Sequence, residues 1–207
     1  MSFRPLVTLG LGALALAALP ACSSTRSGAD PKHSSGARPA AMSEEEAMAK
    51  MMAMAAPGPA HAELMSHAGT WLVDYQYRMG PDAPWQPMQG TVTSKPVLGG
   101  RYLMEEHAME MMGMPMQGLL FLGYDNSTKE YTSLWMDTSS TWWVEARGGK
   151  SAEGTVSMSG TMKDIAGERP YRMKSWGRPD GSMESEMYDT IGGQEVLVMT
   201  MKSRRKP

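Results

Sequence analysis

The sequence predicts an all-β protein, an antiparallel up-and-down barrel of about ten strands, which follows a signal peptide, a linker and one short helix. After position 68, apolar and polar residues alternate with a period of two, as they do in half-buried strands. Turn residues interrupt this alternation at a regular spacing, so about ten strands are expected. Closure of such a meander removes its two exposed edges, and we therefore expect a barrel.

The first 21 residues have the features of a secretory signal. Arg4 supplies a positive charge, Leu6–Leu19 is an uncharged apolar run, and Ala21 is a small residue before the expected cleavage point. The run is shorter than the about 20 residues that a membrane-spanning helix needs. Residues 19–22, Leu-Pro-Ala-Cys, resemble the bacterial lipobox, in which the cysteine becomes the acylated first residue of the mature protein.

Cys22 is the one cysteine of the chain, so no disulfide can form within it. We expect Cys22 to be lipidated, since an exposed free thiol is a liability in an oxidising compartment. The alternative is ordinary cleavage after Ala21, which leaves Cys22 as a free thiol. Ser23, in place of Asp, favours anchoring at the periplasmic face of the outer membrane in a Gram-negative cell.

Residues 22–42 are rich in Ser, Gly, Ala and Pro and predict a disordered tether. A short helix is expected over 43–57, because Ser43 and Glu46 have the spacing of a capping box and Pro57 ends the pattern. Four methionines of this helix, at 48, 51, 52 and 54, predict a packing face; the alternative is a soft-metal motif.

The barrel domain is expected over residues 58–207, and no helix longer than two turns is expected in it. The expected strands share the two-residue period and are bounded by Gly, Asn, Asp or Pro. They are Thr70–Met79, Gly90–Lys95, Arg101–Met109, Gly118–Tyr124, Glu130–Asp137, Trp142–Arg147, Gly154–Met162, Tyr171–Gly177, Met183–Thr190 and Glu195–Lys202.

Several motifs along this domain resemble the bacterial family known as domain of unknown function 1579. They are residues 57–61 (Pro-Gly-Pro-Ala-His), 69–71 (Gly-Thr-Trp), 99–106 (Gly-Gly-Arg-Tyr-Leu-Met-Glu-Glu), 112–118 (Met-Gly-Met-Pro-Met-Gln-Gly), 123–126 (Gly-Tyr-Asp-Asn), 135–137 (Trp-Met-Asp) with Thr141, and 198–206. The resemblance extends from about residue 42 to 206 and implies no particular activity.

The Gly-x-Trp opening at 69–71 is also similar to lipocalin-like barrels. In those barrels a tryptophan of the first strand closes one end, and an arginine from the last strand lies across it. The resemblance implies that Trp71 and Arg205, or Arg204, form this pair. A guanidinium on an indole face contributes roughly 0.5–2 kcal/mol, which is a structural role.

The sequence contains none of the catalytic or phosphate-binding motifs that were sought, namely Gly-x-Ser-x-Gly, His-Glu-x-x-His, the phosphate loop and Gly-x-Gly-x-x-Gly. A net charge of −2 and a pI near 6.1 give no electrostatic basis for binding nucleic acid. We therefore expect a protein that is not an enzyme and carries no cofactor or resident metal. His61 and His67, just before the first strand, are expected to be surface or capping residues.

One strand, Arg101–Met109, raises the question of a buried charge. Alternation places Arg101, Leu103, Glu105 and His107 on one face and Tyr102, Met104, Glu106 and Ala108 on the other. If the second face is inward, Glu106 enters the barrel and must hold a ligand or pair within the core. Asp137 raises the same question. The candidate ligand-binding residues are Trp71, Tyr75, Glu106, Tyr124, Trp135 and Asp137.

Three functions remain open. The first is an anchored lipoprotein whose barrel binds a small apolar or amphipathic ligand. The second is copper handling by Met109, Met111, Met112 and Met114 beside His107, because thioethers and imidazole suit Cu(I). Methionine, with 23 copies, is equally suited to filling an adaptable pocket. The third is a structural envelope protein with a filled barrel and a protein partner.

Overall fold

A computed structural model describes residues 42–207, and the signal peptide, Cys22 and the rest of 1–41 lie outside the described residues. This part of the chain contains two α-helices, one short 3₁₀ turn and ten strands, in the order α1 (Glu44–Ala55), α2 (Pro59–Ser66), β1 (Gly69–Tyr77), β2 (Gln86–Val97), η1 (Leu98–Gly100), β3 (Tyr102–Met111), β4 (Met114–Asp125), β5 (Glu130–Asp137), β6 (Val144–Lys150), β7 (Val156–Asp164), β8 (Gly167–Gly177), β9 (Met183–Ile191) and β10 (Gln194–Arg205).

The strands form a closed antiparallel barrel, as the sequence predicts. Each strand pairs with its neighbours along the chain, and β1 pairs with β10 to complete the circle. This last pairing runs in register from Trp71 opposite Arg205 to Tyr77 opposite Met199. Every strand edge therefore finds a backbone partner, which stabilises a domain that has no disulfide.

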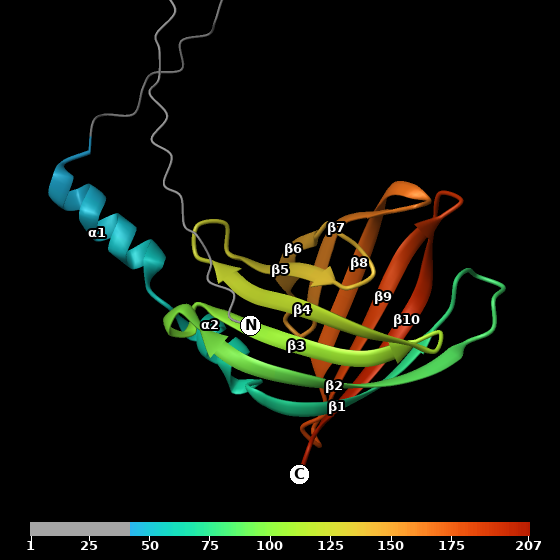
Figure 1. Cartoon of the computed structure of the whole chain (residues 1–207). Coiled ribbons are helices and arrows are strands. Elements are labelled where there is room, and N and C mark those ends of the chain that lie inside the picture. The colour runs from blue at the N-terminus through green and yellow to red at the C-terminus, as the bar shows by residue number, and fades with distance from the viewer. Residues whose placement is uncertain (1–41) are drawn as a thin grey trace, which may run out of the picture. The chain divides into compact units, whose positions relative to one another are not determined.

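The two ends of the barrel differ (Figure 1). At one end, called the helix end, α2 packs on β3, β4 and η1. The loops that follow β1, β3, β5, β7 and β9 lie at the opposite end, which we call the rim. Figure 1 shows α2 at the left of the barrel and the rim at the right and top.

Helix α2 was not expected, and it is the main difference from the sequence prediction. Residues 57–59, Pro-Gly-Pro, were interpreted as a stop signal, whereas Pro59 occupies the first turn of a new helix. Proline is favoured there because its missing N–H would have no partner in any case. The Gly58 N–H donates to Nδ1 of His61 at 3.0 Å, and Leu64 is buried in the core. His61 is thus a capping residue and is itself buried.

Helix α1 is present where it was expected, with a complete capping box between Ser43 and Glu46. None of its residues is buried, so its methionines do not form a packing face against the barrel. Asn126, in the β4–β5 turn, donates at 2.9 Å to the carbonyls of Met54 and Ala56 and thereby holds the end of the helix. Within residues 42–207, neither helix has the length and apolar character needed to cross a membrane.

The interior contains two groups of buried side chains. One surrounds Leu103 and includes Leu64 of α2, and the other surrounds Trp71 and Tyr75 on β1. Many of the remaining inward positions in the strand register are methionines, namely Met88, Met109, Met111, Met116, Met158, Met162, Met173, Met183, Met187, Met199 and Met201.

Trp71 and Arg205 are in contact at the helix end. The guanidinium carbon of Arg205 lies 4.7 Å from the centre of the indole ring. The same guanidinium donates at 2.8 Å to the carbonyls of Ala68 and Ser66, and the indole N–H of Trp71 donates to the His67 carbonyl at 2.9 Å. Arg205 therefore fastens the end of β10 to the junction between α2 and β1.

We expect Arg205→Ala to lower the free energy of unfolding by about 1–2 kcal/mol, because it removes a cation–π contact and two charge-assisted hydrogen bonds. Urea denaturation followed by circular dichroism measures this loss. Arg204→Ala is the matched control, since Arg204 pairs with Asp74 on the exposed outer face. An equal loss in both variants would contradict the role given to Arg205.

Candidate functional site

The clearest group of polar side chains inside the barrel lies on β2 and β3. Ser94 and Glu105 are opposite one another in the strand register, and His107 is two residues beyond Glu105 on the same face. The Ser94 hydroxyl donates to Oε1 of Glu105 at 3.0 Å. Nε2 of His107 lies 3.2 Å from Oε2 of the same carboxylate. Both side chains are largely buried, with 16% of Glu105 and 11% of His107 exposed.

This arrangement corrects the expectation for Glu106. Leu103 is fully buried, so the face of β3 that carries Leu103, Glu105 and His107 is the inner one. Glu106 points outward, and half of its side chain is exposed. Its Oε1 lies 3.2 Å from Nζ of Lys95. Alternation alone gives two equivalent faces, and the wrong one was chosen for the interior.

His107 leaves one polar atom without a partner. Its Nδ1 is buried and has no hydrogen-bond partner among the described residues. Because an ionised carboxylate only accepts, the contact with Glu105 places the ring proton on Nε2 when the imidazole is neutral. Nδ1 is then a buried acceptor that points at no donor of the protein. An unmet buried acceptor carries a free-energy cost, which a ligand donor could remove.

Trp135 and Asp137, on β5, extend this group. The rings of His107 and Trp135 meet edge to face with centroids 4.9 Å apart. The indole N–H of Trp135 donates to Oδ2 of Asp137 at 2.7 Å, and the other oxygen accepts from the backbone N–H of Ser139 at 2.8 Å. We call Ser94, Glu105, His107, Trp135 and Asp137 the interior cluster.

The remaining candidate residues lie elsewhere. Tyr75 is buried on the inner face of β1; burial, with a smaller contribution from the charge of Glu105, raises its pKa well above the usual value. Tyr124 lies at the helix end, in edge contact with His61 and Tyr131, and Trp71 is also at that end. Of the candidates, the structure thus joins Trp135 and Asp137 to the cluster and separates Trp71 and Tyr124 from it.

Sequence reasoning missed Ser94, Glu105 and His107 as site residues. A signal was present, because Leu103 is the most hydrophobic member of either face of this strand and pairs with Pro96 and Leu122 on its neighbours. Assigning the inner face from Leu103 would have placed Glu105 and His107 in the barrel.

The methionines of the possible copper segment are divided by the strand register. Met109, Met111 and Met114 are on the inward face, since Met111 is opposite Met114 in the register, although Met114 at the rim is 65% exposed; Met112 lies in the exposed β3–β4 turn. Within residues 42–207, no group of three or more His, Cys, Asp or Glu side chains is arranged to hold a metal ion. Met109 and Met111 therefore share the inner face of β3 with His107, whereas Met112 does not.

Water reaches parts of the interior wall. Met173, Met187, Met199 and Met201 point inward on β8, β9 and β10, yet each keeps some exposed surface. Side chains inside a closed barrel can be exposed only through its lumen or its ends. The interior cluster therefore belongs to a wall made largely of thioethers that solvent can approach.

Residues 56–205 match the family described as protein of unknown function (DUF1579). The chain belongs to this family. The match includes α2 and nearly all of the barrel, so the interior cluster lies within the DUF1579 region. No curated protein matches the chain.

Gly118 provides a test of the cluster in this DUF1579 protein. A Cβ at position 118 would lie 2.6 Å from Cζ2 of Trp135, so the indole rests directly on the glycine. We expect Gly118→Ala to displace Trp135, to shift its fluorescence and to destabilise the fold by about 1–3 kcal/mol through overpacking. Fluorescence during urea unfolding measures both effects.

Gly149→Ala on β6 is the control, because no atom lies within 4 Å of the Cβ that it adds. If Gly118→Ala were as stable as Gly149→Ala and kept the parent spectrum, Trp135 would not be seated as described.

Proposed function

We propose that this protein binds a small amphipathic molecule inside its barrel. The observation that carries the proposal is the buried, unpartnered Nδ1 of His107, which Glu105 orients from the other side of the ring. A ligand hydroxyl or ammonium group that donates to Nδ1 would satisfy this atom. The apolar part of the ligand would then lie along the methionines of the wall.

The charge of the cluster favours some head groups over others. Glu105 and Asp137 are both carboxylates, and the interior cluster has no arginine or lysine; Arg169, which also faces inward on β8, is paired with Asp164 and Asp189. A fatty carboxylate would bring a further negative charge and no donor, which costs desolvation and gains no hydrogen bond. We therefore infer a neutral or cationic head group, such as a long-chain alcohol or amine.

The methionine-rich wall supports a ligand with an apolar tail of variable shape. Methionine is unbranched and has three rotatable bonds, so it adapts to irregular contacts better than Leu or Val. Its use on β7–β10 and on β2–β4 gives the interior this adaptability on both sides of the cluster. Binding by such a wall requires no catalytic group, and the proposed role is that of a carrier or receptor, without an enzymatic reaction.

We propose further that the barrel is exported and anchored as a lipoprotein. The supporting features are the uncharged run at 6–19, the lipobox-like residues 19–22 and the lone Cys22. Anchoring through acyl chains at Cys22, at the periplasmic face of the outer membrane, would keep the carrier near a source of amphipathic molecules.

Ligand class can be tested with three dansyl-labelled undecyl chains that end in a hydroxyl, an ammonium or a carboxylate group. Titration with each probe, followed by dansyl emission, gives its affinity. We expect the alcohol and the amine to bind at least about tenfold more tightly than the carboxylate. The hydrogen bond to Nδ1 contributes about 1 kcal/mol for the alcohol and roughly 1.5–3 kcal/mol for the charged amine, whereas the carboxylate gains none and loses its hydration.

Glu105→Gln should reduce this preference, because it removes the charge that repels the carboxylate and that orients His107. Glu106→Gln is the matched control on the outer face of the same strand and should leave all three affinities unchanged. Equal effects of the two variants would contradict the interior site. Absence of binding by every probe would favour a filled, structural barrel.

Lipidation is tested by mass spectrometry of the membrane-extracted chain. The expected N-terminal residue is Cys22 with attached acyl chains, and Cys22→Ala should abolish the acyl mass and block processing at this position. A mature chain that begins with an unmodified Cys22 would refute the lipoprotein assignment and leave ligand binding untouched.

A further inference from the structure

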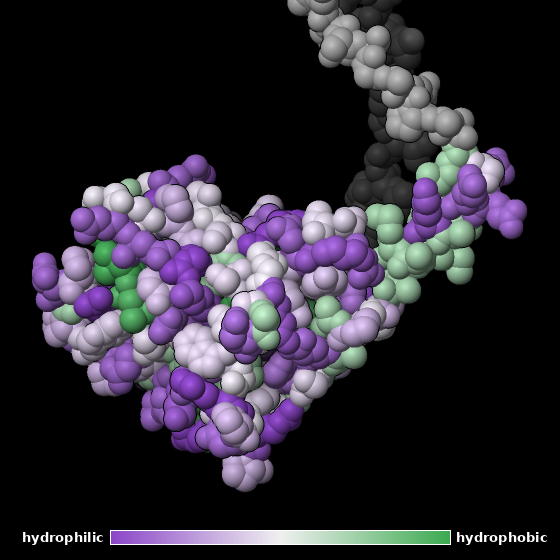
Figure 2. All heavy atoms as spheres, turned by 180° about the vertical axis from the view of Figure 1, so that it is seen from behind, coloured by the Kyte–Doolittle hydropathy of each residue, from purple (hydrophilic) through white to green (hydrophobic). Residues whose placement is uncertain are grey.

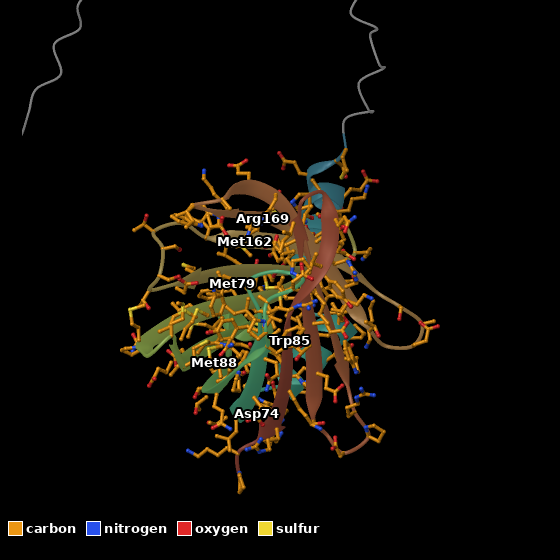
Figure 3. All side chains as sticks on the ribbon, turned by 90° about the vertical axis from the view of Figure 1, so that its right-hand side faces the viewer. Asp74, Met79, Trp85, Met88, Met162 and Arg169 are labelled. Atoms are coloured by element: carbon orange, nitrogen blue, oxygen red, sulfur yellow. The ribbon has the colours of Figure 1, made fainter. Side chains whose placement is uncertain are left out.

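The rim carries a set of large apolar side chains that face solvent. They stand on or beside four separate hairpin connections, those after β1, β3, β5 and β7: Met79, Met112, Met114, Trp143 and Ile165 are more than 60% exposed, and Trp85 and Trp142 are 38% and 37% exposed. Figure 3 labels Met79 and Trp85 on this side of the barrel, with Met162 and Arg169 above them.

The rim turns and most turns of the helix end differ in charge; the exception at the helix end is the β2–β3 turn, where Leu98 is 72% exposed. The rim turns have uncharged tips, at 79–81, 112–113, 139–143, 165–166 and 192–193. Turns at the helix end, such as 125–130, 150–153 and 178–181, each contain acidic and basic residues. The face seen from behind in Figure 2 is mostly hydrophilic or near neutral, apart from a green patch at its left and the green side chains of α1. Exposed apolar side chains on one end of a polar barrel mark a contact surface.

The charged residues near the rim are largely paired with one another. Arg169 lies between Asp164 and Asp189, at 2.7 Å and 2.6 Å. Lys163 pairs with Glu168 at 3.3 Å. Arg169 with its two aspartates has a net charge of −1, and Asp82 and Glu110 form no ion pair among the described residues. The rim is therefore mildly acidic, and we expect no electrostatic attraction to an anionic surface.

The apolar tips are supported by structure beneath them. Arg78 donates to the carbonyls of Leu197 at 2.8 Å and Pro81 at 2.7 Å, and its guanidinium lies 4.6 Å from the ring centre of Trp85. The β1–β2 loop is therefore fixed, and it still exposes 82% of Met79. Local hydrogen bonds hold the loop in a conformation that leaves this thioether in water.

Met112 is an independent indication. Its φ is +53°, in the left-handed region that glycine and asparagine tolerate and methionine rarely adopts. Its side chain is 75% exposed, so neither backbone preference nor burial in the barrel accounts for a methionine at this turn. An exposed apolar residue at a strained position points to a function outside the fold. Leu98, at the helix end, is a second such residue, with a φ of +50° and 72% exposure.

We propose that the rim docks on the interfacial region of a lipid bilayer, with Met112, Trp142 and Trp143 among the inserted side chains. A protein partner would need a surface complementary to tips on four separate hairpins, whereas a fluid interface accepts each tip individually. Tryptophan is enriched at the level of lipid head groups, where an apolar ring with a polar N–H is well accommodated. Uncharged tips favour zwitterionic over anionic lipid.

Docking would place the rim end of the barrel against the membrane. This inference is independent of the proposed ligand, because vesicle contact is measured with no ligand present. It is also independent of acylation at Cys22, since an anchor fixes the N-terminal side of the chain and not the rim. Failure of rim docking would leave both earlier proposals standing.

The test uses the chain from residue 23 onward, which has no Cys22 to acylate, with phosphatidylcholine vesicles whose acyl chains are brominated, because bromine quenches tryptophan at close range. Three of the six tryptophans, Trp85, Trp142 and Trp143, lie on rim loops. We therefore expect emission to fall by about one third or more if these rings reach the interface. The quenching should persist in 1 M salt and should not increase with anionic lipid.

The double variant Trp142→Ser, Trp143→Ser should lose most of the quenching. Trp176→Phe is the matched control, since Trp176 is on β8 near the helix end and should not contribute. Met112→Asn is a second variant that suits the left-handed turn, so it should keep or raise stability while the quenching falls at least twofold.

Equal quenching of the double variant and the parent would overturn the proposal, as would no quenching of the parent. Sedimentation in the absence of vesicles tests a second copy as the occupant of the rim. A dimer that the same substitutions dissociate would assign these side chains to self-association and refute membrane docking.

Discussion

The pairing of β1 with β10 is the constraint on which the rest of the molecule depends. It joins residues more than a hundred positions apart and satisfies the backbone groups of both terminal strands. With no disulfide available, closure and the packing beneath it hold the domain together. The Arg205 contact with Trp71 strengthens this seam at the helix end, where the last strand meets the first.

A closed sheet also determines which side chains share the interior. Because Leu103 is fully buried, the face of β3 that carries it is the inner one. The two-residue period of the strand then places Glu105 and His107 inside the barrel as well, together with Ser94 of β2. The result is a small acidic and imidazole-bearing group in a wall of thioethers. Burial of a polar group in such a wall costs free energy unless the group forms a hydrogen bond. The unpartnered Nδ1 of His107 is therefore a stronger argument for a ligand than any single apolar contact.

The fold was predictable because its signals are local and repeated. Ten strand segments were expected and ten are present, and Glu130–Asp137 has the expected bounds. Helix α2 was missed because Pro59 was taken to end a helix when it begins one. The site was harder to predict, since the choice between the two faces of β3 depends on neighbours in space. Trp135 and Asp137 were anticipated; Glu105 and His107 were not, and Glu106 was placed on the wrong side.

The packing of the Trp135 indole on Gly118 limits which residues related sequences can have at these two positions. Trp135 is the diagonal neighbour of Gly118, whose direct partner on β5 is Asp137, and its ring fills the space that a Cβ at position 118 would need, so neither position can change size alone. Among relatives of this barrel, a larger residue at position 118 should accompany a smaller ring or an aliphatic chain at position 135. Covariation of this kind would identify residues that line the lumen from homologous sequences alone.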